Sequence, residues 1–141
     1  MDKEVFLEIT GVQTNDEGTD QTELFTQGRY IQKGRSNYIV YDETETTGFE
    51  GCKTIVKVEN EERVVMRRTG KSPSHLIIQK GVRNLGVYGT AAGDIQIGIY
   101  ADKIVNRLDE HGGRVYFKYQ LDINSVFISE NEVTINIKEC K

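Results

Sequence analysis

The chain has 141 residues and a mass of 16.0 kDa, which is enough for one domain with a sizeable core and too little for two ordinary domains. It carries 14 Ile and 13 Val against 6 Leu and 3 Ala, and because β-branched side chains favour strands, this composition excludes an α-helical domain. The formal net charge of −4 gives no overall attraction to nucleic acid or to an anionic membrane surface.

Apolar and polar residues alternate with a period of two along most of the chain, and turn residues interrupt the pattern at short intervals. The expected strands, in chain order, cover residues 4–10, 20–33, 38–44, 54–58, 63–69, 76–78, 85–90, 95–104, 115–123 and 133–137. Residues 102–110 also carry apolar side chains at near-helical spacing, so a single helical turn there is the alternative to a strand.

These strands predict a closed sheet. Short connections pair neighbouring strands antiparallel, and one apolar face per strand covers a core on one side only. An open sheet of this kind would leave two exposed edges, which closure removes. We therefore expect an all-β protein, a single antiparallel up-and-down β-barrel of about 8–10 strands, spanning residues 1–141 as one domain.

The sequence gives some indication of location. No apolar run approaches the roughly 18 residues of a membrane-spanning helix, so we expect no membrane association. The first residues show no basic stretch followed by an apolar one, which predicts no signal peptide and a cytoplasmic protein. Cys52 and Cys140 are expected to be reduced thiols in that compartment, with a disulfide between them as the alternative.

Motifs that carry catalytic or metal chemistry are lacking. Gly70-Lys71-Ser72 resembles the end of a phosphate-binding loop, but Val65 stands where that loop needs glycine, so a turn is expected. Neither His75 nor His111 is spaced with a second metal ligand, and both are expected at the surface. We predict no enzyme activity, no catalytic residue, no metal and no cofactor; a nucleophile and base assembled from distant residues remain the alternative.

Charge is distributed unevenly. Residues 63–93 contain no Asp or Glu but six cations: Arg63, Arg67, Arg68, Lys71, Lys80 and Arg83. The interpretation we favour is a solvated face balanced by acidic neighbours. The alternative is an anion site, which would take a phosphate, a carboxylate or an acidic partner, and no nucleic acid is expected.

The hairpin around Asn60-Glu61 decides which arginine of this segment faces the interior. A turn of two or four residues places Thr54 opposite Arg67 on the apolar face, whereas an odd turn would reverse every side chain and point Arg68 inward. Because an isolated buried charge is costly, an inward Arg67 needs a partner, for which Glu43 is the candidate. The predicted ligand-binding residues of the lumen are Tyr41, Glu43, Thr54, Arg67, Thr90 and Tyr119.

Five segments of the chain carry a family resemblance: residues 38–43, 53–58, 65–70, 88–90 with Gly93, and 119–121. In this order they resemble the bacterial YwiB-like β-barrel proteins. The resemblance covers nearly the whole chain and implies a calycin-like (lipocalin-like) barrel in a bacterial cytosolic setting. It implies no activity, because the family is of unknown function. The family pattern has one arginine shortly before a glycine where this chain has Arg67 and Arg68, and the facing argument selects Arg67.

A barrel of this type can hold one small ligand. We therefore predict a cytosolic barrel that binds a small anionic or amphiphilic molecule in its lumen. The alternative is an interaction module that uses its outer basic surface and has no internal ligand. An open cavity lined by an arginine and tyrosines favours the first prediction, and an interior filled with side chains favours the second.

Overall fold

The computed structural model describes residues 1–90 and 92–140, with the side chain of Thr90 outside the description. It contains ten strands and one short 3-10 helix: β1 (Asp2–Asn15), β2 (Gly18–Lys33), β3 (Ser36–Asp42), η1 (Glu45–Thr47), β4 (Lys53–Glu59), β5 (Arg63–Thr69), β6 (Ser74–Gln79), β7 (Arg83–Thr90), β8 (Gly93–Asp109), β9 (Gly112–Ile123) and β10 (Val126–Glu139). In the described part of the chain, no helix is long and apolar enough to cross a membrane.

The strands form one closed antiparallel barrel. Each strand pairs with its neighbours in sequence, and β1 pairs with β10 to close the sheet. The prediction of an all-β, up-and-down barrel is confirmed. Residues 102–109 continue β8 as a strand, past an irregularity in register between Ala101 and Lys103, so the alternative of a helical turn there is wrong.

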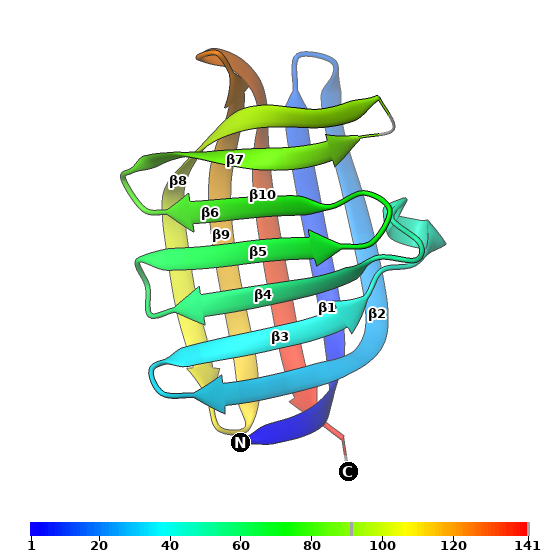
Figure 1. The fold of residues 1–141 in the computed structure, drawn as a ribbon. Helices are drawn as coiled ribbons and strands as arrows, with labels where there is room; N and C mark the ends of the chain where they lie inside the picture. The colour runs from blue at the N-terminus through cyan, green and yellow to red at the C-terminus, as the bar shows by residue number, and fades with distance from the viewer. Residues whose placement is uncertain (91, 141) are drawn as a thin grey trace.

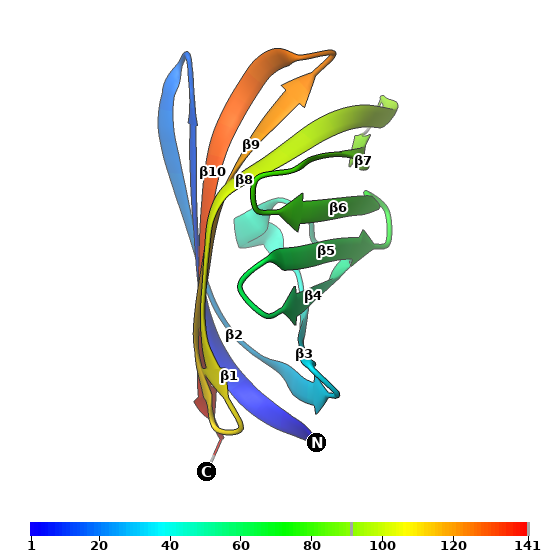
Figure 2. The ribbon, with the colours of Figure 1, turned by 90° about the vertical axis from the view of Figure 1, so that its left-hand side faces the viewer.

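The barrel is flattened into two layers that cross. The long strands β1, β2 and β8 to β10 form one layer, and the shorter strands β3 to β7 run across it (Figure 1). The view from the side separates the two layers (Figure 2). Strand β2 pairs with β3 only from Arg29 onward. At the corner before it, a Cβ on Gly28 would lie 2.5 Å from the Val40 carbonyl oxygen, so this close approach requires glycine.

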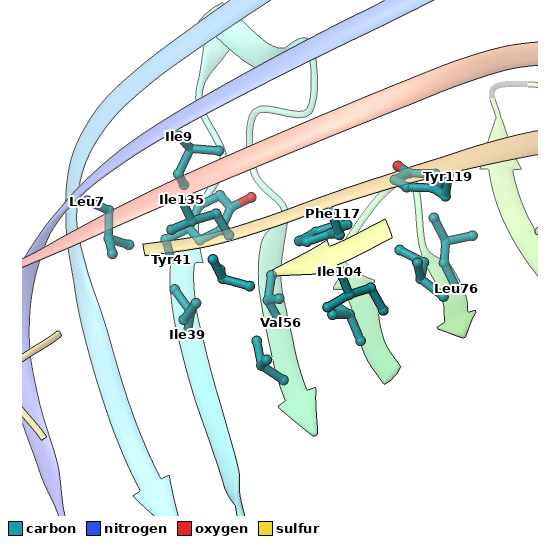
Figure 3. Close-up of a cluster of buried hydrophobic side chains, with 14 of the residues drawn as sticks. Leu7, Ile9, Ile39, Tyr41, Val56, Leu76, Ile104, Phe117, Tyr119 and Ile135 are labelled. Atoms are coloured by element: carbon teal, nitrogen blue, oxygen red, sulfur yellow. The ribbon is translucent and has the colours of Figure 1, made fainter. Parts of the chain in front are cut away.

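Apolar side chains fill most of the interior. The largest fully buried ones are Tyr30, Ile39, Ile78, Ile99, Phe117 and Ile135. They come from both layers and interlock in one cluster, part of which Figure 3 shows with Tyr41 and Tyr119 among its members. Burial of this cluster removes apolar surface from water, which is the main favourable term in folding.

Candidate functional site

The β4–β5 hairpin has a three-residue turn, residues 60–62, so the prediction that Arg67 faces the interior is wrong. Thr54 pairs with Arg68 rather than with Arg67, and Arg67 lies opposite Ile55 on the outer face, where it is exposed. Asn60 opens the turn with φ 53° and accepts a hydrogen bond from the Glu62 N–H at 2.7 Å through its side-chain oxygen. An odd number of turn residues reverses the facing of the whole strand, as the alternative register required.

The corrected register produces a continuous polar row across the inner face of the short strands. The pairs Tyr41–Thr54, Thr54–Arg68, Arg68–Ser74 and Ser74–Tyr88 connect β3 to β7. Directly opposed residues share a face of the sheet, so these side chains lie beside one another. The preceding row, Ile39–Val56–Met66–Leu76, contains only apolar side chains.

A cavity of about 210 Å³ opens along this polar row, and we call it the mouth cavity. Its walls combine the row with Glu43 and Tyr119 and with apolar side chains from both layers, including Ile9, Leu24, Met66, Leu76 and Val133. The loop between β3 and β4, which includes η1, supplies Thr47 and Phe49. Figures 1 and 2 together place η1 at the side of the barrel, between the two layers.

Arg68 is held rigidly at the wall of the mouth cavity and is only 8% exposed. Its Nε donates a hydrogen bond to the Ser72 carbonyl oxygen at 2.6 Å. Its Cζ lies 3.5 Å from the ring centroid of Phe49 and 5.1 Å from that of Tyr88, which is within the range of cation–π attraction. These contacts fix the plane of the guanidinium without neutralising its charge.

One nitrogen of this guanidinium lacks a partner among the described residues. Its Nη2 is buried and has no hydrogen-bond partner in the described part of the protein. Within the same residues, no carboxylate lies at ion-pair distance from Arg68. An unsatisfied buried donor is unusual in a native structure and is more costly when it carries charge.

Glu43 lies in the mouth cavity but does not form the predicted ion pair with an arginine. Its Oε2 accepts a hydrogen bond from Thr54 Oγ1 at 3.0 Å. Burial raises the pKa of the Glu43 carboxyl above its ordinary value, and the hydrogen bond from Thr54 and the charge of Arg68 oppose that rise without cancelling it. This carboxyl is therefore easier to protonate than one at the surface.

Two tyrosines of the cavity remain neutral. Tyr41 is 6% and Tyr119 is 7% exposed, and burial raises the pKa of both phenols well above the ordinary value. The neighbouring Glu43 carboxyl raises the pKa of Tyr41 further. Both phenols thus keep their protons at neutral pH and are available as hydrogen-bond donors. Tyr119 also stacks on Phe117, with ring centroids 6.0 Å apart.

Five of the six predicted lumen residues border the mouth cavity: Tyr41, Glu43, Thr54, Arg67 and Tyr119. Arg67 pairs with Ile55 on the outer face of the sheet and is exposed, and the side chain of Thr90 lies outside the described residues. Arg68 was placed inside only in the alternative register, and Phe49 and Tyr88 were not among the predicted site residues. An asparagine at the start of the turn, a residue type that tolerates positive φ, is the signal that could have favoured the odd register.

The six cations of residues 63–93 do not form one surface. Arg68 faces inward, Arg63 pairs with Glu59 at 2.9 Å, and Arg83 forms two hydrogen bonds with Asp122. Outside the barrel this leaves Arg67, Lys71 and Lys80, which are exposed. Acidic neighbours thus balance part of this face, in line with the favoured interpretation.

The histidines and cysteines of the chain do not belong to the mouth cavity. His75 and His111 are exposed, as predicted. Cys52 is buried, Cys140 is half-buried, and both are free thiols. Among the residues that the structure describes, no three His, Cys, Asp or Glu side chains cluster closely enough to hold a metal ion.

Comparison with known proteins places the chain in a family. The family described as "Domain of unknown function (DUF1934)" matches residues 7–135. The crystal structure of the ywiB protein from Bacillus subtilis shares the fold with a TM-score of 0.86 and 24% sequence identity, over 99% of this chain and 94% of that one. None of the curated proteins matches the chain. The predicted resemblance to YwiB-like barrels is confirmed, and the chain belongs to the DUF1934 family of unknown function.

Proposed function

We propose that this protein binds a small amphiphilic anion in the mouth cavity, with the anionic group on Arg68. The observation that supports this proposal is the buried guanidinium of Arg68, whose Nη2 has no partner within the described residues although the side chain lines a cavity. An anion would supply the missing acceptor. Arginine is suited to this task because its parallel N–H groups match the two oxygens of a carboxylate or phosphate.

The dimensions of the cavity set the size of the ligand. A volume of about 210 Å³ corresponds to the space of about seven water molecules, so we expect a ligand of roughly ten non-hydrogen atoms or fewer. Apolar side chains such as Leu24, Met66 and Leu76 line the cavity beside Arg68. A ligand with one anionic end and a short apolar body would satisfy both kinds of surface.

On this proposal the protein is a binding protein and not an enzyme. The cavity offers the hydroxyl groups of Thr54 and Ser74, but no histidine or cysteine lines it among the described residues. A hydroxyl nucleophile would need such a neighbouring base. We further propose a cytoplasmic location, which the two free thiols support.

Octanoate, with about ten non-hydrogen atoms, is a suitable probe. We expect isothermal titration calorimetry to detect octanoate binding by the unmodified protein at pH 6. Arg68→Met should weaken the affinity by about tenfold or more, because a charge-assisted hydrogen bond contributes about 1.5–3 kcal/mol. Arg67→Met, the matched variant one residue away on the outer face, should leave the affinity unchanged.

A neutral probe completes the experiment. 1-Octanol has the same chain length and no charge, so the loss of Arg68 should have little effect on its binding. Equal affinities of Arg68→Met and Arg67→Met for octanoate would contradict the proposal, as would the absence of octanoate binding by the unmodified protein.

A further inference from the structure

We propose, building on the function above, that the mouth cavity selects monoanions and takes up one proton on Glu43 as it binds them. The proton comes from solvent and ends on the Glu43 carboxylate, so that the filled cavity contains Arg68 as a cation, the ligand as a monoanion and Glu43 as a neutral acid. Glu43 would thus determine specificity by charge and by donating a hydrogen bond.

Two charged groups with opposite sign face the mouth cavity from its inner wall. Arg68 on β5 and Glu43 beyond the end of β3 line the same space, yet they do not lie at ion-pair distance. Because both groups line one cavity, an anion that binds Arg68 would share that cavity with Glu43. An anion on Arg68 would then bring a second negative charge towards the Glu43 carboxylate, in surroundings where like charges repel strongly.

No group around Glu43 in the described part of the chain can neutralise a second negative charge, so protonation of Glu43 would relieve the repulsion. Thr54 on β4 hydrogen-bonds to Glu43 Oε2 at 3.0 Å, and Thr47 of η1 lies on the same side. The titratable neighbours on β3, β7 and β9 are Tyr41, Tyr88 and Tyr119, and all are phenols. Phenols cannot supply a second positive charge. Arg68 is thus the only inward-facing cation among the described lining residues, because Arg67 points out.

The carboxyl is already poised for this change, since burial raises the pKa of Glu43 in the empty cavity. Because proton binding by Glu43 and ligand binding are coupled, the direction in which affinity changes with pH follows. If the ligand raises the pKa of Glu43 further, affinity is greatest when Glu43 is protonated and falls as pH rises through the interval between the two values. A dianion would leave one charge without a counterpart even with Glu43 protonated, so a monoanionic ligand is favoured.

The test uses three probes and two variants. Octanoate and hexyl sulfate are monoanions between pH 6.0 and 8.5, whereas hexyl phosphate becomes a dianion above its second pKa of about 6. Hexyl sulfate and hexyl phosphate share a tetrahedral headgroup and chain length, so their comparison isolates charge from shape. Glu43→Gln mimics the protonated acid and can still accept from Thr54. Asp42→Asn removes the neighbouring carboxylate, whose side chain is 81% exposed.

For the unmodified protein and Asp42→Asn, we expect the affinity for both monoanions to fall by about tenfold or more between pH 6.0 and 8.5. Calorimetry in buffers of different ionisation enthalpy should show uptake of up to one proton per ligand bound. Glu43→Gln should bind both monoanions with a flat pH profile and no proton uptake. Hexyl phosphate should bind more weakly than hexyl sulfate at pH 8.5.

The outcomes separate this inference from the function on which it rests. If octanoate binding depends on Arg68 but the unmodified protein and Glu43→Gln show the same pH profile and no proton uptake, this inference is overturned and the proposed function stands. If neither protein binds octanoate or hexyl sulfate at any pH, the proposed function fails and this inference with it. A thermal unfolding transition for Glu43→Gln confirms that the variant is folded in either case.

Discussion

The two halves of the barrel interior differ although the same strands build both. Along the inner face of β4, Val58 and Val56 lead to Thr54, and along β5, Val64 and Met66 lead to Arg68. Strands β3 and β6 make the same change, from Ile39 to Tyr41 and from Ile78 to Ser74. Each of these strands therefore contributes apolar contacts at one end and a polar group at the other, and the site is assembled from strand ends that meet at one place.

This comparison assigns different roles to the two halves. In the apolar half, the hydroxyl group of the buried Tyr30 donates a hydrogen bond to the Asp109 carbonyl oxygen at 2.8 Å. In the polar half, the Nη2 of Arg68 is left without one among the described residues. We infer that the apolar half stabilises the fold. The polar half contains an unsatisfied buried donor, which lowers stability but is available to bind a ligand.

The largest expected effect lies in the apolar half. Phe117 is fully buried, and Phe117→Ala should lower the free energy of unfolding by about 3–5 kcal/mol, because it removes buried surface and leaves a cavity. Chemical denaturation of the unmodified protein and the variant measures this difference. A loss below about 1 kcal/mol would mean that the apolar half is not the stabilising region.

The corner of β2 should give the next largest effect. Gly28→Ala places a Cβ 2.5 Å from the Val40 carbonyl oxygen and 2.6 Å from Leu7 Cδ1, and we expect a loss of about 1–3 kcal/mol in the free energy of unfolding. Gly11→Ala is the control, because a Cβ there would meet no atom within 4 Å. Equal denaturation midpoints for the two variants would show that the crossing of the layers does not depend on Gly28.

A smaller effect is expected from Glu43, and it depends on pH. Because the pKa of Glu43 is raised in the folded protein, its contribution is fully present below the pKa of the unfolded chain and is lost as pH rises through the folded value. Glu43→Gln should therefore become more stable relative to the unmodified protein as pH rises from 4 to 8. Denaturation across this range measures the trend, with Asp42→Asn as control; parallel profiles for all three proteins would contradict it.

Arg68→Met should have only a small effect on stability. The variant loses the contact with Phe49 and the hydrogen bond to Ser72, but it also removes a buried charge that lacks a full set of partners. We expect a change of about 1 kcal/mol or less in the free energy of unfolding, and about 0.5 kcal/mol or less for Arg67→Met. A loss of about 3 kcal/mol or more for Arg68→Met would indicate a closed internal network in place of a ligand site.

The barrel could be predicted from the sequence because the alternation of apolar and polar residues recurs in many strands. Alternation in segments such as 115–123 identifies one face without ambiguity, and Tyr119 could be placed inside on that ground. The register of β5 could not be predicted in the same way, since Val64, Val65 and Met66 are apolar on both faces. Which side chains of β5 point inward depends on whether the β4–β5 turn has an even or an odd number of residues. The alternation within the strand does not reveal that number.

Phe49 shows a second limit of sequence reasoning. It lies in a polar loop with no periodicity, and only the folded chain brings its ring to 3.5 Å from the Arg68 Cζ. Tyr88 became a member of the site through the pairing of β6 with β7. The site therefore depends on loop geometry and register, which are the features that pattern analysis determines least well.

The central claim, that the mouth cavity binds an amphiphilic anion, can be tested most directly through the two methionines of the chain. Met66 lines the cavity, whereas Met1 is 54% exposed and is not among the lining residues. In protein labelled with carbon-13 at the methionine methyl groups, octanoate at pH 6 should shift the Met66 resonance in a saturable manner and leave that of Met1 unchanged. An unshifted Met66 resonance at saturating octanoate, or equal shifts of both resonances, would contradict the account.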